Sequence, residues 1–188
     1  CQQVMAGPRT ARRWSKPDPQ NAEPAAAVAL AAVRLYQPDE AREAILRTHA
    51  LGGDEALIKL IGEASDSGGT AIALDTFRPL LESKDVSDRL LSAGVELALE
   101  SFDFATARKL ADRMLTNEPA PGAARAQLAG VLTAEGDAVA AIAVSQEAAA
   151  LEPETERFAY ADTLLRLDRL DEARQELENL RSDAAVRD

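Results

Sequence analysis

The 188-residue sequence has one cysteine and one histidine, and aromatic residues make up only 4% of it. The cysteine is the first residue, so no disulfide can form within the chain. His49, the only imidazole, cannot supply a metal cluster or a nucleophilic triad with a cysteine so far away in the sequence. No apolar run reaches the roughly 18 residues of a membrane-spanning helix. No glycine loop has the spacing of a phosphate cradle. We therefore expect a protein that is not an enzyme and has no metal, cofactor or small-molecule substrate.

Composition and charge narrow the class of fold and partner. Apolar residues make up 46% of the chain and charged residues 28%, which is typical of a folded protein rather than a disordered one. The abundance of alanine and leucine favours closely packed helices. The net charge is −11, but residues 1–21 carry +3 (four basic residues and one acidic), which leaves −14 for the remainder. An acidic body repels phosphates, so we expect no nucleic-acid partner.

The segment 88–121 has the most regular pattern in the chain. Two apolar stripes with helical spacing are separated by Ser101-Phe102-Asp103, which we interpret as a turn, and Pro119 is expected to end the second helix. The stripe positions are Leu91, Gly94, Val95 and Ala98, then Ala107, Ala111 and Met114. Neither helix could bury its stripe alone, so the pattern predicts a pair of antiparallel helices.

Alanines recur through the chain at the position where such helix pairs would cross. The spacings are 32, 34, 34 and 32 residues, for Ala41, Ala73, Ala107, Ala141 and Ala173. This pattern resembles the tetratricopeptide repeat (TPR). The resemblance implies an all-α, right-handed α-solenoid of about five helix-turn-helix repeats over residues 22–188. The repeats are expected at 22–53, 54–87, 88–121, 122–153 and 154–187.

Single glycines, prolines and arginines add expectations about where the helices begin, end or bend. Gly52-Gly53 should end the first repeat, and Pro38 should lie in the first turn of a helix, where its missing N–H costs nothing. Pro79 should kink the second helix of repeat two. The last helix, near residues 171–181, should have an apolar flank that no further helix covers. Arg125 and Arg157 replace apolar residues of the repeat pattern.

Residues 1–21 are expected to form an extended, flexible tether, since they contain three prolines and no helical period. Cys1, followed by Gln2 rather than aspartate, resembles the start of a mature bacterial lipoprotein. That resemblance implies acyl chains on Cys1 and anchoring at the periplasmic face of an outer membrane. Trp14, the only tryptophan, is either a docking residue, at a membrane or in a groove, or an incidental exposed aromatic.

In TPR proteins the first helix of each repeat lines a concave groove that holds a protein segment. Carried over to this sequence, the resemblance predicts groove residues on four of the five repeats. They are Leu30, Val33, Ile58, Arg89, Ser92, Glu96, Leu99, Phe158, Asp162 and Leu165. The small residues Gly62 and Gly130 either leave room for a ligand backbone or only accommodate curvature. The basic clamp with which some TPR modules hold acidic chaperone tails is missing.

The lipid anchor and the repeats together resemble the pilotin lipoproteins of Tad and type IV pilus machines. The function predicted by this resemblance is to bind a secretin subunit and to assist its assembly in the outer membrane. One alternative is a lipoprotein scaffold for envelope enzymes or for outer-membrane protein assembly. The other is a soluble TPR adaptor, a fragment of a longer protein in which Cys1 has no special role.

Overall fold

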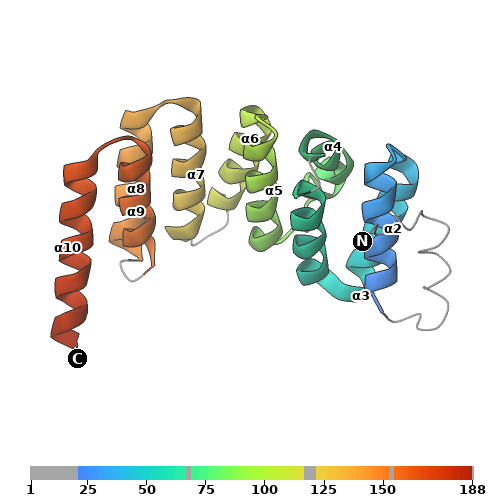
Figure 1. Cartoon of the computed structure of the whole chain (residues 1–188), viewed down its shortest axis with the longest axis horizontal. Helices are drawn as coiled ribbons and strands as arrows, with labels where there is room; N and C mark the ends of the chain where they lie inside the picture. The colour runs from blue at the N-terminus through green and yellow to red at the C-terminus, as the bar shows by residue number, and fades with distance from the viewer. Residues whose placement is uncertain (1–20, 67–68, 117–121, 153–154, 188) are drawn as a thin grey trace, which may run out of the picture. The chain divides into compact units, whose positions relative to one another are not determined.

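The computed structural model describes residues 21–66, 69–116, 122–152 and 155–187, and for 184–187 the backbone alone. These residues form nine helices and no strand, which confirms the all-α fold (Figure 1). The expectations for Cys1, Trp14 and Pro119 concern residues outside this set. The helices are α2 Glu23–Arg34, α3 Pro38–Ser65, α4 Thr70–Leu81, α5 Asp88–Glu100, α6 Phe104–Leu115, α7 Gly122–Glu135, α8 Ala138–Leu151, α9 Glu156–Arg166 and α10 Leu170–Arg187.

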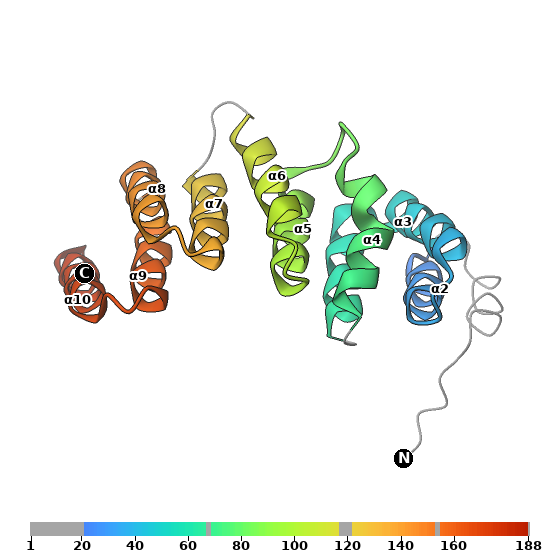
Figure 2. The ribbon, with the colours of Figure 1, turned by 90° about the horizontal axis from the view of Figure 1, so that it is seen from above.

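The chain divides into two compact units, and the boundary falls between Asp103 and Phe104. In unit 1, α3 packs against α2, α4 and α5, and it lies between α2 and α4 in both ribbon views (Figure 1, Figure 2). In unit 2, helices α6 to α10 each pack on the next, and α7 also packs on α9. Such contacts between sequence neighbours are those expected of stacked repeats.

The crossing alanines are completely buried. Ala41, Ala73, Ala107, Ala141 and Ala173 each have 0% of their surface exposed. The first-helix stripe at Leu91, Val95 and Ala98 is buried too, as is the second-helix stripe at Ala107, Ala111 and Met114. The periodicity of small residues in the sequence therefore identifies positions that are completely buried in the helical stack.

The first and second repeats join at a backbone break inside α3. Gly53 has φ 60° and ψ −159°, so α3 consists of two helical parts, residues 38–52 and 54–65, with no linker between them. A Cβ on Gly52 would lie 2.6 Å from the Ala56 Cβ and 2.9 Å from the Ala22 Cβ. The predicted end of a helix at Gly52-Gly53 is thus confirmed, and both glycines are needed there, one for its φ angle and one for close packing.

The turn between the two helices of a repeat has the same conformation wherever it is described. A residue with positive φ follows the first helix, and the next backbone N–H donates to a carbonyl five residues earlier, as from Gln37 to Ala32 and from Asp103 to Ala98. This is the Schellman arrangement, which satisfies the last carbonyls of a helix. The residues with positive φ at these turns are Tyr36, Phe102, Gly136 and Asp168. Pro38 opens α3, as predicted.

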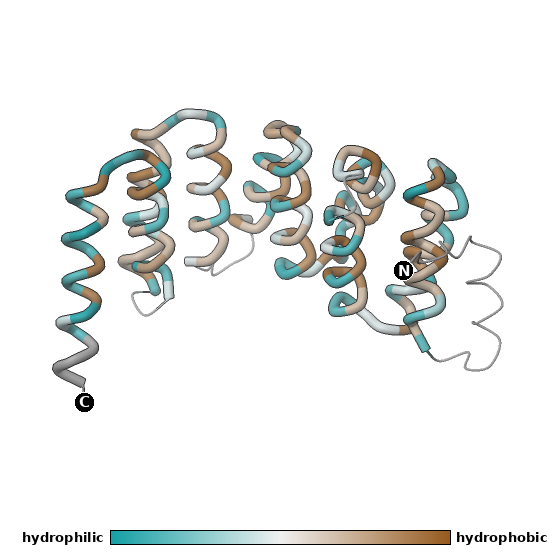
Figure 3. The backbone as a smooth tube through the Cα atoms, in the orientation of Figure 1, coloured by the Kyte–Doolittle hydropathy of each residue, from teal (hydrophilic) through white to brown (hydrophobic). Residues whose placement is uncertain are grey.

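Helix α4 continues past Pro79 only to Leu81, so the proline lies in the last turn of the helix. Helix α10 packs on α9 and is mainly hydrophilic, although Leu170 and Leu177 are exposed (Figure 3). The predicted apolar flank of the last helix is therefore limited to a few leucines among charged residues.

Candidate partner-binding surface

A groove lies between α2 and the 54–65 part of α3, the first helices of repeats one and two. Its volume is about 260 Å³, and it is open to solvent. Ala26 and Leu30 of α2 line it, as the groove prediction requires, and Leu30 is half-buried. Three of its lining residues are charged, Glu23, Lys59 and Glu63, and the others are Ala22, Ala27, Ala56 and Leu60. Small side chains on both walls leave space for an inserted segment.

A second part of this surface, the α3–α5 strip, lies between two polar contacts that join α3 to α5. At one end the Arg89 guanidinium donates to Glu55 at 3.1 Å, and at the other end the Ser65 hydroxyl donates to Glu100. Helical spacing places Ile58 and Gly62 between these contacts on α3. Likewise, it places Ser92 and Glu96 between them on α5. The α3–α5 strip therefore collects four of the predicted groove residues, Ile58, Arg89, Ser92 and Glu96, and Leu99 follows on α5.

The predicted residues of repeat five lie on α9 in unit 2. Phe158 is 59% exposed and Leu165 is 47% exposed, and Asp162 is exposed as well. Asp162 lies 3.9 Å from Arg166 of the same helix, a contact between exposed side chains that contributes little. Helix α9 thus exposes a phenylalanine and a leucine seven positions apart, with the charged Asp162 between them in the sequence.

Val33 corrects the groove prediction. Only 3% of its surface is exposed, and it lines a different cavity, together with Tyr36 and Pro38 of the following segment and Ile72 of α4. Because α2 ends one residue after Val33, the chain folds back beside it into α3. Val33 is therefore part of the packing at the end of α2 and not of the partner-binding surface.

The two arginines that depart from the repeat pattern form ion pairs. Arg157 of α9 donates from Nε to Glu176 at 2.5 Å and from Nη1 to Asp183 at 2.6 Å, both on α10. Arg125 of α7 lies 3.7 Å from Glu147 of α8. The hydrogen bonds with Glu176 and Asp183 raise the pKa of Arg157. In the last two repeats, an ion pair thus connects the first and second helices where repeat three has the buried Leu91.

The only histidine belongs to a cluster that joins three helical segments of unit 1. Asp54 accepts a hydrogen bond from the Ser87 hydroxyl, and its other oxygen lies 3.0 Å from His49 Nε2. The Ser87 oxygen also caps α5, by accepting from the Leu90 N–H at 3.3 Å. The carboxylate thus separates the imidazole from the hydroxyl, whereas activation of a serine requires the imidazole beside it. The arrangement suits a structural junction.

Asp54→Asn is expected to reveal this junction through the pH dependence of stability. The Ser87 hydrogen bond, followed by the hydrogen bond and charge of His49 and the charge of Arg89, lowers the pKa of Asp54 below 3.8. The carboxylate therefore stabilises the fold above about pH 3.8, and this contribution is lost as the pH falls through the lowered value. We expect the variant to lose about 1 kcal/mol of unfolding free energy at neutral pH.

Urea unfolding at neutral pH and near pH 3 measures this effect. The difference between the variant and the wild type should become smaller at the acidic pH. Asp85→Asn, which removes the same charge from an exposed residue, is the matched control. Equal losses for both variants would show that net charge, and not the junction, accounts for the effect.

A buried carboxyl in unit 2 has an explanation in packing. Glu156 is 8% exposed, and burial raises the pKa of its carboxyl. A Cβ on Gly122 would lie 2.9 Å from the Glu156 Cγ, so the absence of a side chain there lets α7 begin against α9.

Among the described residues no acidic, cysteine or histidine cluster could hold a metal ion. No described helix is both long and apolar enough to cross a bilayer.

The sequence analysis assigned no functional role to two exposed aromatic residues of unit 1. Tyr36 and Phe102 have φ angles of 56° and 59°, and they are 72% and 81% exposed. A bulky residue with positive φ is strained, and Gly136 occupies the equivalent turn position without strain. Their place in the repeat, aligned with that glycine, is the signal that could have identified them. Strained, exposed side chains are candidates for a binding role.

The fold described above is similar to the folds of several solved proteins. A tetratricopeptide repeat protein from Parabacteroides merdae aligns with a TM-score of 0.61 and 14% identity, over 93% of this chain and 71% of that one. The chain has the tetratricopeptide repeat fold. Yeast Tom70 aligns with a TM-score of 0.55 and 17% identity, over 92% of this chain and 38% of its own.

A third structure, a putative kinesin light chain of Podospora anserina with nearly identical TPR-like repeats, has a TM-score of 0.53 and 15% identity. It aligns over 87% of this chain and 94% of its own length. At these identities the likeness concerns the fold alone. No family model matches the sequence. No curated protein matches it either.

Proposed function

We propose that this TPR chain binds a segment of a protein partner on the first helices of its repeats. The observation that carries this proposal is the α2–α3 groove, which opens on the helices where the repeat pattern expects a ligand. Four alanines, Ala22, Ala26, Ala27 and Ala56, line it. Because these side chains are short, a helix or extended segment can bring its backbone close to the wall and bury its own apolar side chains.

The charges around the groove favour a partner segment with polar residues beside its apolar ones. Glu23 and Glu63 bring two negative charges to the groove and Lys59 one positive charge. On the α3–α5 strip, Arg89 is paired with Glu55, while Glu96 is exposed. An amphipathic segment that places lysine or arginine near Glu63 and Glu96 would match this pattern, since complementary charges guide orientation.

The surroundings of Gly62 distinguish the two interpretations of the small residues, namely room for a ligand backbone and accommodation of curvature. It lies inside a helix and is exposed, and a Cβ built on it meets no atom within 4 Å. A glycine in a helix costs roughly 0.5–1 kcal/mol relative to alanine. Packing within unit 1 therefore gives no reason for this cost. Space for a ligand backbone on the α3–α5 strip is the reason we propose.

Gly62→Ala and Gly62→Trp together test this function. Alanine is expected to raise the unfolding free energy by roughly 0.5–1 kcal/mol, since it improves helix propensity without a clash. Tryptophan is expected to block the strip and abolish partner binding while the fold persists. Binding is read by photo-crosslinking from a reactive residue at position 26 in the groove, in the native cell. A reactive residue at Leu46, exposed on the 38–52 part of α3, is the reference position.

Gly69→Trp is the matched control, because its Cβ also meets nothing within 4 Å and it precedes α4. Crosslinks that appear at position 26, not at position 46, and that only Gly62→Trp removes would support the proposal. Crosslinks at position 26 that survive Gly62→Trp would leave the partner in the α2–α3 groove and contradict its extension over the α3–α5 strip. Crosslinks at position 46 instead of position 26 would place the partner on another surface and overturn the proposal. A loss of stability in Gly62→Ala would contradict the open space around Gly62.

For the identity of the partner, we propose a secretin subunit or another envelope protein, with acyl chains on Cys1 as the membrane anchor at the outer membrane. This finer proposal is supported by the resemblance of Cys1-Gln2 to a lipoprotein start and by the TPR fold. The intact mass of the N-terminal peptide from native membranes tests it. Acyl groups on Cys1 would support an outer-membrane escort. An unmodified Cys1 would leave a soluble adaptor, and a crosslinked cell-wall enzyme would favour the scaffold alternative.

A further inference from the structure

The end of unit 1 formed by α2 and the 38–52 part of α3 has a shallow pocket. Pro24, Ala25 and Val28 of α2 and Ala44 of α3 form its apolar part. Helix α2 packs on α3 and slightly on α4, and in the described residues no other helix covers this face. In a stack of repeats, an end face needs a polar or protective cover.

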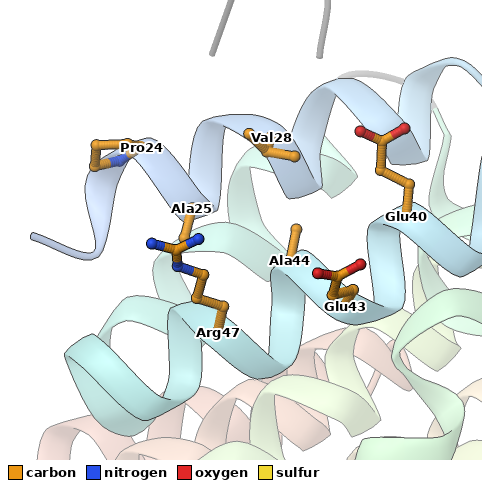
Figure 4. Close-up of a pocket in the computed structure, with 7 residues that line it drawn as sticks. All are labelled: Pro24, Ala25, Val28, Glu40, Glu43, Ala44 and Arg47. Atoms are coloured by element: carbon orange, nitrogen blue, oxygen red, sulfur yellow. The ribbon is translucent and has the colours of Figure 1, made fainter. Parts of the chain in front are cut away.

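Charged side chains surround the pocket in a definite order. Figure 4 shows the carboxylates of Glu40 and Glu43 toward one end of the apolar part and the guanidinium of Arg47 beside Ala25 toward the other. Glu43 is exposed, and Glu40 is half-buried. A ligand that fits this face would carry positive charge next to a flat apolar or aromatic group, since a guanidinium stacks well on an aromatic ring.

The chain itself carries such a group close by. Arg12 and Arg13 precede Trp14, and residues 1–21 have a charge of +3 against −14 for the remainder. Trp14 is seven positions before Asn21, where the described structure begins, and α2 starts two residues later. Seven residues span up to about 23 Å when extended, whereas the 12 residues of α2 cover about 18 Å. Every part of the end face is therefore within reach.

We propose that the segment Arg12-Arg13-Trp14 docks in cis on this end face, with the indole against Pro24, Val28 and Ala44 and the two guanidinium groups near Glu40 and Glu43. The covalent link gives the segment a local concentration of the order of millimolar, so even weak contacts suffice. The docked segment serves as the cap of the first repeat. It occupies a face distinct from the α2–α3 groove and leaves that groove open to a partner.

Trp14 is the only tryptophan, so its fluorescence in the chain 1–188 reports directly on docking. The expected result is blue-shifted emission with acrylamide quenching severalfold weaker than for a free tryptophan peptide. Both signals should be independent of protein concentration and should weaken in high salt, which screens the charge contacts. The variant Glu40→Lys/Glu43→Lys should shift the emission to that of exposed tryptophan. The control Asp171→Lys/Glu178→Lys, which changes two exposed acidic residues of α10, should not.

A charge swap distinguishes a loss of docking from unfolding of the variant. Adding Arg12→Glu/Arg13→Glu to Glu40→Lys/Glu43→Lys is expected to restore the blue-shifted emission and the protection. Fully exposed Trp14 in the wild-type chain would overturn the proposal. Protection that appears only at high protein concentration would indicate docking on a second copy, and protection that appears only with lipid vesicles would indicate a membrane contact; either would overturn docking in cis.

Discussion

Replacing Gly53 with alanine is expected to lower the free energy of unfolding by roughly 1–3 kcal/mol. Gly53 adopts φ 60° and ψ −159°, a backbone conformation that is essentially restricted to glycine. The break at this residue lets the second helix of repeat one end and the first helix of repeat two begin without a linker. Alanine would force the backbone out of this conformation or strain it there. Urea denaturation followed by far-UV circular dichroism measures the loss.

Gly62→Ala, in the same helix α3, is the matched comparison for this substitution. It adds the same methyl group at a helical position with open space around it, and it is expected to stabilise the fold. The two variants should therefore change stability in opposite directions. If both variants are more stable than the wild type, the two parts of α3 form one continuous helix in solution. That result would contradict the break at Gly53.

The sequence predicted the parts of the fold that depend on local sterics and on periodicity. The crossing alanines, the turn at Ser101-Phe102-Asp103 and the helix start at Pro38 agree with the structure because each depends on residues close in the chain. A small side chain at each crossing has one physical cause, the close approach of two helices, and it recurs once per repeat. Such a signal accumulates over five repeats and becomes stronger than helix propensity alone.

Features that depend on contacts between repeats could not be predicted in this way. Asp54 and Ser87 are 33 positions apart, and nothing in either residue's neighbourhood identifies the other as its partner. Val33 was expected on the groove because the resemblance to the TPR assigns its repeat position to the groove, but the end of α2 is covered by residues that the repeat pattern does not consider. The ion pairs of Arg157 similarly involve Glu176 and Asp183 of the next helix, which the residues around Arg157 do not identify. Repeat position predicts where a partner would bind and does not identify the partner.

Ala141→Leu is expected to destabilise unit 2 by roughly 1–3 kcal/mol, because three additional carbons would be forced into the crossing of α7 and α8. Ala141 is 0% exposed, and α8 packs on both α7 and α9. The side chain can therefore find space only by moving a helix or by adopting a strained rotamer. Thermal unfolding monitored by circular dichroism should show a lower midpoint.

Ala143→Leu is the control, since this alanine is exposed on the same helix and its enlargement should change stability by less than about 0.5 kcal/mol. An equal, small effect of both substitutions would contradict the repeat register on which the partner-binding surface also depends. Hydrogen exchange gives a sharper test. Repeats contact mainly their neighbours, so faster exchange in Ala141→Leu should be concentrated in α7, α8 and α9. Equally fast exchange in α2 would mean that the chain unfolds as one cooperative body and not repeat by repeat.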